Sequence, residues 1–258
     1  MPIFGNSMLS LISDIDTGQF VLFLLVALFI GMSKTGVSGL GLAVVPLLAI
    51  AFGARESTGL MIPLLIIADI YAVIYYHRMA EWKHIIRLMP WAMIGTLGGV
   101  LAGNYISAAG FRMMLSILVF GGLAIMVVRD LMKKSESIPE NRWFAATIGI
   151  LGGFSSMVGN AAGPVFAVYL LAMRLPKNSF IGTGAWFFFI INLFKLPFHI
   201  WVWKTVTPAS FGLDLLALPL IIAGAWMGIR IVRLFSEKVY RIFVVSMTFL
   251  SALLLLLR

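Results

Sequence analysis

The chain alternates long apolar segments with short polar connectors. The apolar segments cover residues 19–53, 57–77, 85–107, 111–128, 143–173, 178–203, 209–229 and 239–257. A helix needs about 20 apolar residues to cross a hydrocarbon core of about 30 Å, so six of these segments have the length of one span. Segments 19–53 and 143–173 are too long for one crossing and too short for two. The pattern predicts an all-α polytopic membrane protein in which these two segments form helical hairpins.

A glycine-rich break interrupts both of the long segments. The first lies in GMSKTGVSGLGLAVVP (31–46), and the second lies in GGFSSMVGNAAGPVFAVY (152–169), about 121 residues later. We therefore expect two repeats, 1–132 and 143–258, joined by a connector at 133–142. Each repeat should hold one broken hairpin, made of two short helices, and three transmembrane helices. Duplicated broken helices are typical of the substrate sites of secondary transporters.

The placement of lysine and arginine indicates how the segments cross the membrane. If each long segment enters and leaves on the same side, thirteen cations share one face and four lie on the other, a strong positive-inside bias. If each long segment crosses only once, the same cations divide almost evenly. The hairpin topology is favoured; it places both termini outside and makes the repeats inverted. The inner cations are Arg78, Lys83, Arg87, Arg129, Lys133, Lys134, Arg142, Arg174, Lys177, Arg230, Arg233, Lys238 and Arg241, and the outer ones are Arg55, Arg112, Lys204 and Arg258.

Composition excludes several classes of protein. Apolar residues make up 61% of the chain and charged residues 11%, which is typical of membrane proteins. The net charge of +9 does not indicate nucleic-acid binding, because the cations lie at segment ends and form no basic stripe. Cysteine is absent, and the three histidines lack metal-ligand spacing. We expect no cofactor, no metal and no enzymatic activity; the expected partners are the lipid bilayer and a small substrate.

The breaks also resemble the motif of a known family. GVSGLG at 36–41, followed by Pro46, and GNAAGP at 159–164 are similar to motifs of the sulfite exporter TauE/SafE family. The resemblance covers nearly the whole chain. It implies transport of a small anion, such as sulfite or the organosulfonate sulfoacetate, across a bacterial inner membrane. With the charge bias above, both termini are then expected to be periplasmic.

An anion at membrane depth needs positive potential, which helix N-termini supply through free N–H groups and the helix dipole. Glycine at the breaks permits φ > 0 and close approach of a ligand to the backbone. We expect both breaks to meet near the midplane around one substrate. Small residues could instead serve only close helix packing. The predicted substrate-binding residues at the breaks are Ser33, Thr35, Ser38, Gly39, Ser155, Ser156, Gly159 and Asn160.

Ionisable residues inside spans usually face a cavity or a partner. We therefore predict that Lys34 and Lys195 bind substrate, although Lys34 could instead snorkel to the interface. A two-residue slip between the repeats places Asp69 opposite Asn192. That position favours a role for Asp69 in proton or ion coupling, with a plain Asp–Lys pair as the alternative. The remaining candidates are Asn192 and Trp186 for the substrate site and His199 for coupling.

Two functions remain open from the sequence. The first is a secondary transporter that exports its anion by alternating access with proton coupling. The second is a passive anion channel, because half-helices can also line a pore. The intramembrane acid and cation favour coupling. The chain holds no GxxxxGK[ST] motif for primary transport and no catalytic constellation that would indicate an enzyme.

Overall fold

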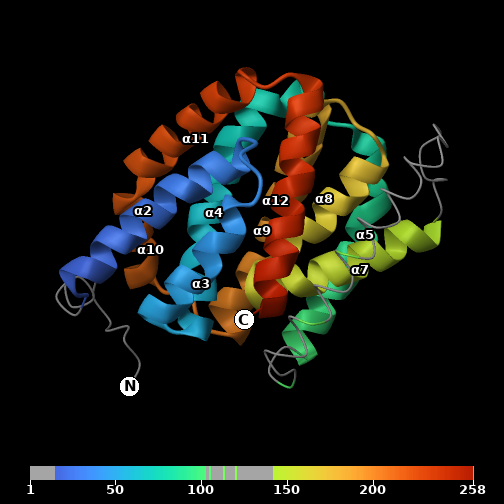
Figure 1. Cartoon of the computed structure of the whole chain (residues 1–258). Helices are drawn as coiled ribbons and strands as arrows, with labels where there is room; N and C mark the ends of the chain where they lie inside the picture. The colour runs from blue at the N-terminus through green and yellow to red at the C-terminus, as the bar shows by residue number, and fades with distance from the viewer. Residues whose placement is uncertain (1–14, 103–104, 106–112, 114–119, 121–141, 258) are drawn as a thin grey trace.

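The computed structural model describes residues 15–102, 105, 113, 120 and 142–257, and every regular element in these residues is helical. The expected all-α class is therefore confirmed. The predicted span 111–128 and most of the connector 133–142 lie outside the described residues. The helices shown in Figure 1 are α2 (Thr17–Lys34), α3 (Leu40–Phe52), α4 (Ala54–Tyr76), the 3-10 turn His77–Met79, α5 (Trp82–Ala102), α7 (Arg142–Gly159), α8 (Ala162–Ala172), α9 (Lys177–Pro197) with a π-helical extension Phe198–Val202, α10 (Pro208–Leu216), α11 (Leu218–Arg233) and α12 (Glu237–Leu257).

Several of the described helices have the length and composition of membrane spans. Four qualify alone, and α10 with α11 makes a fifth if the bent pair counts as one span. Apolar helices of this length identify an integral membrane protein. The four are Thr17–Lys34, Glu56–Met79, Trp82–Leu101 and Lys177–Val202.

The predicted span 209–229 is not one straight helix. It consists of α10 and α11, which meet at Ala217 with a bend of 52°. Pro219 lies in the first turn of α11. Proline has no backbone N–H and its ring clashes with the preceding turn, so it favours a kink or a break at this position.

Both predicted hairpins consist of two helices joined by a short break. We name residues 35–39 the first elbow and residues 160–161 the second elbow. Gly36 and Gly39 have φ of 120° and 95°, and Asn160 has φ of 51°, values in the left-handed region that glycine and asparagine tolerate best. The expectation of two short helices is wrong for the first helix of each hairpin, because α2 and α7 have 18 residues each. The second helices are shorter, with 13 residues in α3 and 11 in α8.

Two helix pairs hold the bundle together through glycine. α11 runs along α2 and α5 runs along α7, as Figure 1 shows. At four glycines an added Cβ would collide with a backbone carbonyl oxygen of the facing helix, so the backbones are in direct contact. The pairs are Gly95–Ile150 and Gly153–Ala92 between α5 and α7, and Gly224–Leu28 and Gly31–Ile221 between α11 and α2.

We expect Gly153→Ala to destabilise the protein and Gly152→Ala to leave it stable. An alanine Cβ at 153 would overlap the carbonyl oxygen of Ala92, and overpacking of this kind costs about 1–3 kcal/mol. At the adjacent Gly152 the nearest atom would be Cγ1 of Val165 at 3.6 Å, an ordinary contact. Thermal unfolding in detergent compares the two variants, and equal midpoints would contradict the close approach of α5 to α7.

Candidate functional site

A cavity of about 140 Å³ lies between the two elbows and is lined further by α4, α9 and α12. One water molecule needs roughly 10–15 Å³ of volume measured in this way, so the cavity has room for a small ion with several waters. Both hairpins therefore contribute to one site. The predicted substrate-binding residues that line it are Ser33, Lys34, Ser38, Gly39, Ser156, Asn160, Asn192 and Lys195.

The first turns of two helices also border the cavity. Gly39 and Gly41 lie at the start of α3, and Ala162, Gly163 and Pro164 form the start of α8. The N-terminal N–H groups of a helix lack intrahelical partners, and the helix dipole adds positive potential there. The two starts thus give the cavity a positive character without an exposed cation.

Lys34 turns inward, toward an acid. Its Nζ lies 2.8 Å from Oδ1 of Asp69, with the lysine side chain 12% exposed and the aspartate 0%. The same Nζ lies 4.5 Å from the centre of the Phe188 ring, within cation–π range. Snorkelling of Lys34 to the interface is therefore wrong for this structure, and the Asp–Lys pair is present.

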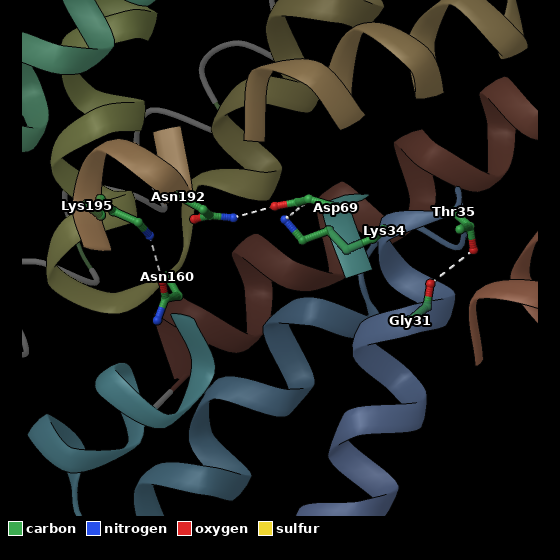
Figure 2. Close-up of polar contacts among 7 residues, drawn as sticks. All are labelled: Gly31, Lys34, Thr35, Asp69, Asn160, Asn192 and Lys195. Atoms are coloured by element: carbon green, nitrogen blue, oxygen red, sulfur yellow. Dashed lines mark hydrogen bonds and ion pairs between the residues drawn. The ribbon is translucent and has the colours of Figure 1, made fainter. Parts of the chain in front are cut away.

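Asp69 is also held from the second repeat. Asn192 donates its Nδ2–H to Oδ2 of Asp69 at 2.6 Å (Figure 2). The expected juxtaposition of Asp69 and Asn192 is confirmed. Asp69 does not line the cavity, but Lys34 and Asn192 do. Asp69 is therefore connected to the cavity through these two neighbours.

Lys195 is buried without a paired carboxylate among the described residues. Its side chain is 0% exposed, and its Nζ donates to the carbonyl oxygen of Ser156 at 3.0 Å. The same Nζ donates to Oδ1 of Asn160 at 2.8 Å, as Figure 2 shows. Within the described part of the chain, the ion pair of Lys34 with Asp69 is the only one found. A buried ammonium normally has an anionic partner, because its desolvation costs several kcal/mol.

Three predicted residues at the breaks lie outside the cavity lining. The Thr35 hydroxyl donates to the carbonyl oxygen of Gly31 at 3.0 Å (Figure 2), and the Ser155 hydroxyl donates to that of Gly152, also at 3.0 Å. Both hydroxyls are buried, and each bonds to a backbone carbonyl of the first helix of its hairpin. Gly159 is the last residue of α7. These residues shape the ends of α2 and α7.

Trp186 and His199 also lie outside the lining. Trp186 packs against Trp82, with ring centres 5.1 Å apart, and against Phe189. His199 is fully buried in the π-helical turn, with Nδ1 2.9 Å from Oγ1 of Thr205. Its Nε2 has no hydrogen-bond partner among the described residues.

The sequence analysis did not identify the contribution of α12. Tyr240, Thr248 and Ser251 of this helix line the cavity. Thr248 and Ser251 are buried polar residues three positions apart in a largely apolar segment, and this spacing places them on one helix face. This spacing was visible in the sequence, but two hydroxyl side chains indicate a cavity less strongly than a charged residue inside a span does.

The residues that the structure describes include no group of three or more His, Cys, Asp or Glu side chains that could hold a metal ion. A comparison with known protein families matches residues 23–255 to a family described as sulfite exporter TauE/SafE. The chain belongs to the TauE/SafE family. Neither the curated proteins nor the solved structures compared with it give a match. TauE/SafE membership implies a membrane transporter that exports sulfite or a related sulfur anion.

We expect the Lys34–Asp69 pair to show strong coupling in a double-mutant cycle. Lys34→Met leaves the carboxylate of Asp69 buried without its cation, and breaking a buried pair in this way costs about 3–5 kcal/mol. Lys34→Met combined with Asp69→Asn removes both charges and should recover most of that loss. Thermal unfolding of the purified variants measures the cycle. Additive losses would show that the two charges do not interact.

Proposed function

We propose that this TauE/SafE chain transports a small sulfur oxyanion or organosulfonate by alternating access, with Lys195 as the principal cation for the substrate. The observation that carries the proposal is the burial of Lys195 beside the cavity, with no carboxylate paired to it in the described residues. A bound anion would supply the missing charge. The starts of α3 and α8 add N–H donors to the same space.

The charges around the cavity support proton coupling. With both lysines protonated and Asp69 ionised, two cations and one anion leave a net charge of +1, which a monoanion balances. A dianion such as sulfite is balanced only when Asp69 also takes up a proton. That proton would end the ion pair and release Lys34 toward the substrate. His199, one helical turn beyond Lys195 and with a free Nε2 among the described residues, is a second proton carrier in this proposal.

Flux into proteoliposomes tests the function. We expect saturable uptake of sulfite or a small sulfonate that responds to a proton gradient, with little uptake of a carboxylate of the same size. Lys195→Met should reduce uptake by about tenfold or more, because a charge-assisted hydrogen bond contributes about 1.5–3 kcal/mol, and Lys195→Arg should retain more of it. Unsaturable flux that ignores the gradient would favour the passive channel instead.

Asp69→Asn separates coupling from binding. The variant keeps the size of the side chain but cannot exchange a proton, so flux should lose its response to the proton gradient while anion affinity is retained. Asp16→Asn is the control, because Asp16 lies at the N-cap of α2 outside the cavity lining. An unchanged gradient response in Asp69→Asn would exclude this carboxylate from coupling.

Contacts between α9 and α12 support alternating access, because they close one end of the cavity. Phe180 and Tyr240 both line it, with their rings edge to face at 5.8 Å between centres. One turn earlier on each helix, the backbone N–H of Lys177 donates to Oε2 of Glu237 at 2.7 Å. In this proposal the two helices form an inner gate on the cation-rich side, and they separate there when the site opens inward.

Cross-linking tests the gate. The wild-type chain contains no cysteine, so Lys177→Cys with Glu237→Cys introduces one unique pair. A short bifunctional methanethiosulfonate should join them, abolish flux and allow its recovery after reduction. The two single-cysteine variants, treated identically, are the controls. Full flux in the cross-linked protein would exclude separation of α9 from α12 at this end.

A further inference from the structure

Two glycines that line the cavity and two in the close helix contacts have an evident structural reason. Gly36 and Gly39 adopt left-handed φ values, and Gly31 and Gly153 lie against a backbone carbonyl of a neighbouring helix. Gly163 has neither reason. It is the second residue of α8, its φ is outside the left-handed range, and an added Cβ would meet no atom of the described residues within 4 Å apart from its chain neighbours.

The surrounding described residues therefore leave room for a side chain at position 163. Alanine favours a helix over glycine, whereas a Cβ directly before Pro164 disfavours the helical conformation. These two effects oppose each other, so helix stability gives no strong preference for glycine there. Gly163 lines the cavity, and the empty volume beside its Cα belongs to the space that a substrate would occupy. A methyl group at this position would reduce that space directly.

The chemistry of the neighbouring wall indicates which part of a substrate lies there. After Gly163, the residues of α8 that line the cavity include Phe166, Ala167 and Leu170, all apolar. The charged groups Lys34 and Lys195 come from other helices. An anion held by the lysines would thus place an organic substituent, where it has one, along α8.

We propose that Gly163 is a specificity-determining residue, whose missing side chain leaves room beside α8 for the organic part of a sulfonate. This inference rests on the proposed function, because it concerns the size of the anion that the same cavity accepts. A larger residue at 163 discriminates against long substituents and spares the smallest anions.

The test compares methanesulfonate, ethanesulfonate and propanesulfonate in proteoliposomes of wild type, Gly163→Ala and Gly163→Val. One methylene in a confined site changes selectivity by about tenfold or more. We expect the propanesulfonate-to-methanesulfonate flux ratio to fall by about that factor in Gly163→Ala and further in Gly163→Val. Gly152→Ala is the matched control, since its Cβ makes an ordinary contact outside the cavity lining. Its flux ratio should equal that of the wild type.

Thermal unfolding in detergent accompanies the flux series. We expect the midpoint of Gly163→Ala to lie close to that of the wild type, because the helix preference of alanine and the cost of a Cβ before Pro164 oppose each other. A midpoint that falls as in Gly153→Ala would overturn the inference, because the glycine would then serve packing. If the wild type is active and Gly163→Ala is stable, unchanged flux ratios would overturn this inference but leave the proposed function standing. A wild type that moves none of the sulfonates nor sulfite would overturn the proposed function and the inference with it.

Discussion

Backbone groups at a helix break find no hydrogen-bond partner in lipid, so both elbows must be satisfied by protein groups or by water in the cavity that they border. At the first elbow the Tyr76 hydroxyl donates to the carbonyl oxygen of Thr35 at 3.4 Å. At the second elbow Lys195 donates to the carbonyl oxygen of Ser156, while the side chain of Asn160 reaches the Thr58 carbonyl at 3.4 Å. The second elbow thus recruits the cation that gives the cavity its charge. The hydrogen bonds that satisfy the backbone at the second elbow are therefore the ones that hold Lys195 beside the cavity.

The two lysines at the site have different hydrogen-bonding partners, and this difference determines where positive charge is available in the cavity. Lys34 has a carboxylate partner in Asp69, so its charge is largely neutralised within the fold. Lys195 has only neutral oxygen acceptors among the described residues. Neutral acceptors lower the cost of burying an ammonium but do not cancel its charge. Under the proposed function a bound anion would therefore gain most near Lys195, while the contribution of Lys34 would depend on the state of Asp69.

The sequence predicted best where a polar residue stood alone in an apolar segment. Lys34, Asp69, Asn192 and Lys195 were identified in this way, and the structure brings the acid together with its expected neighbour. Glycine clusters located the elbows for a similar reason, because few residues accept left-handed φ. Packing between neighbouring helices was harder to predict from the sequence. Trp186 was expected at the cavity and lies against Trp82 instead. An aromatic residue in a lipid-exposed bundle carries no sign of which neighbour it faces, and hydropathy alone did not reveal the bend between α10 and α11.

The pairing of helices explains how movement could reach the site. Each of the close glycine contacts joins an N-terminal-half helix to a C-terminal-half helix, α2 with α11 and α5 with α7. The contact of Gly95 with Ile150 has its counterpart in that of Gly224 with Leu28, and such matched contacts support a pseudo-symmetric origin of the two halves. Neither half is then a separate rigid body, since each hairpin's first helix is fixed to the opposite half. The second helices, α3 and α8, begin at the elbows and border the cavity. In the proposed alternating access, rotation at the elbows would change access to the cavity while the glycine contacts stay intact.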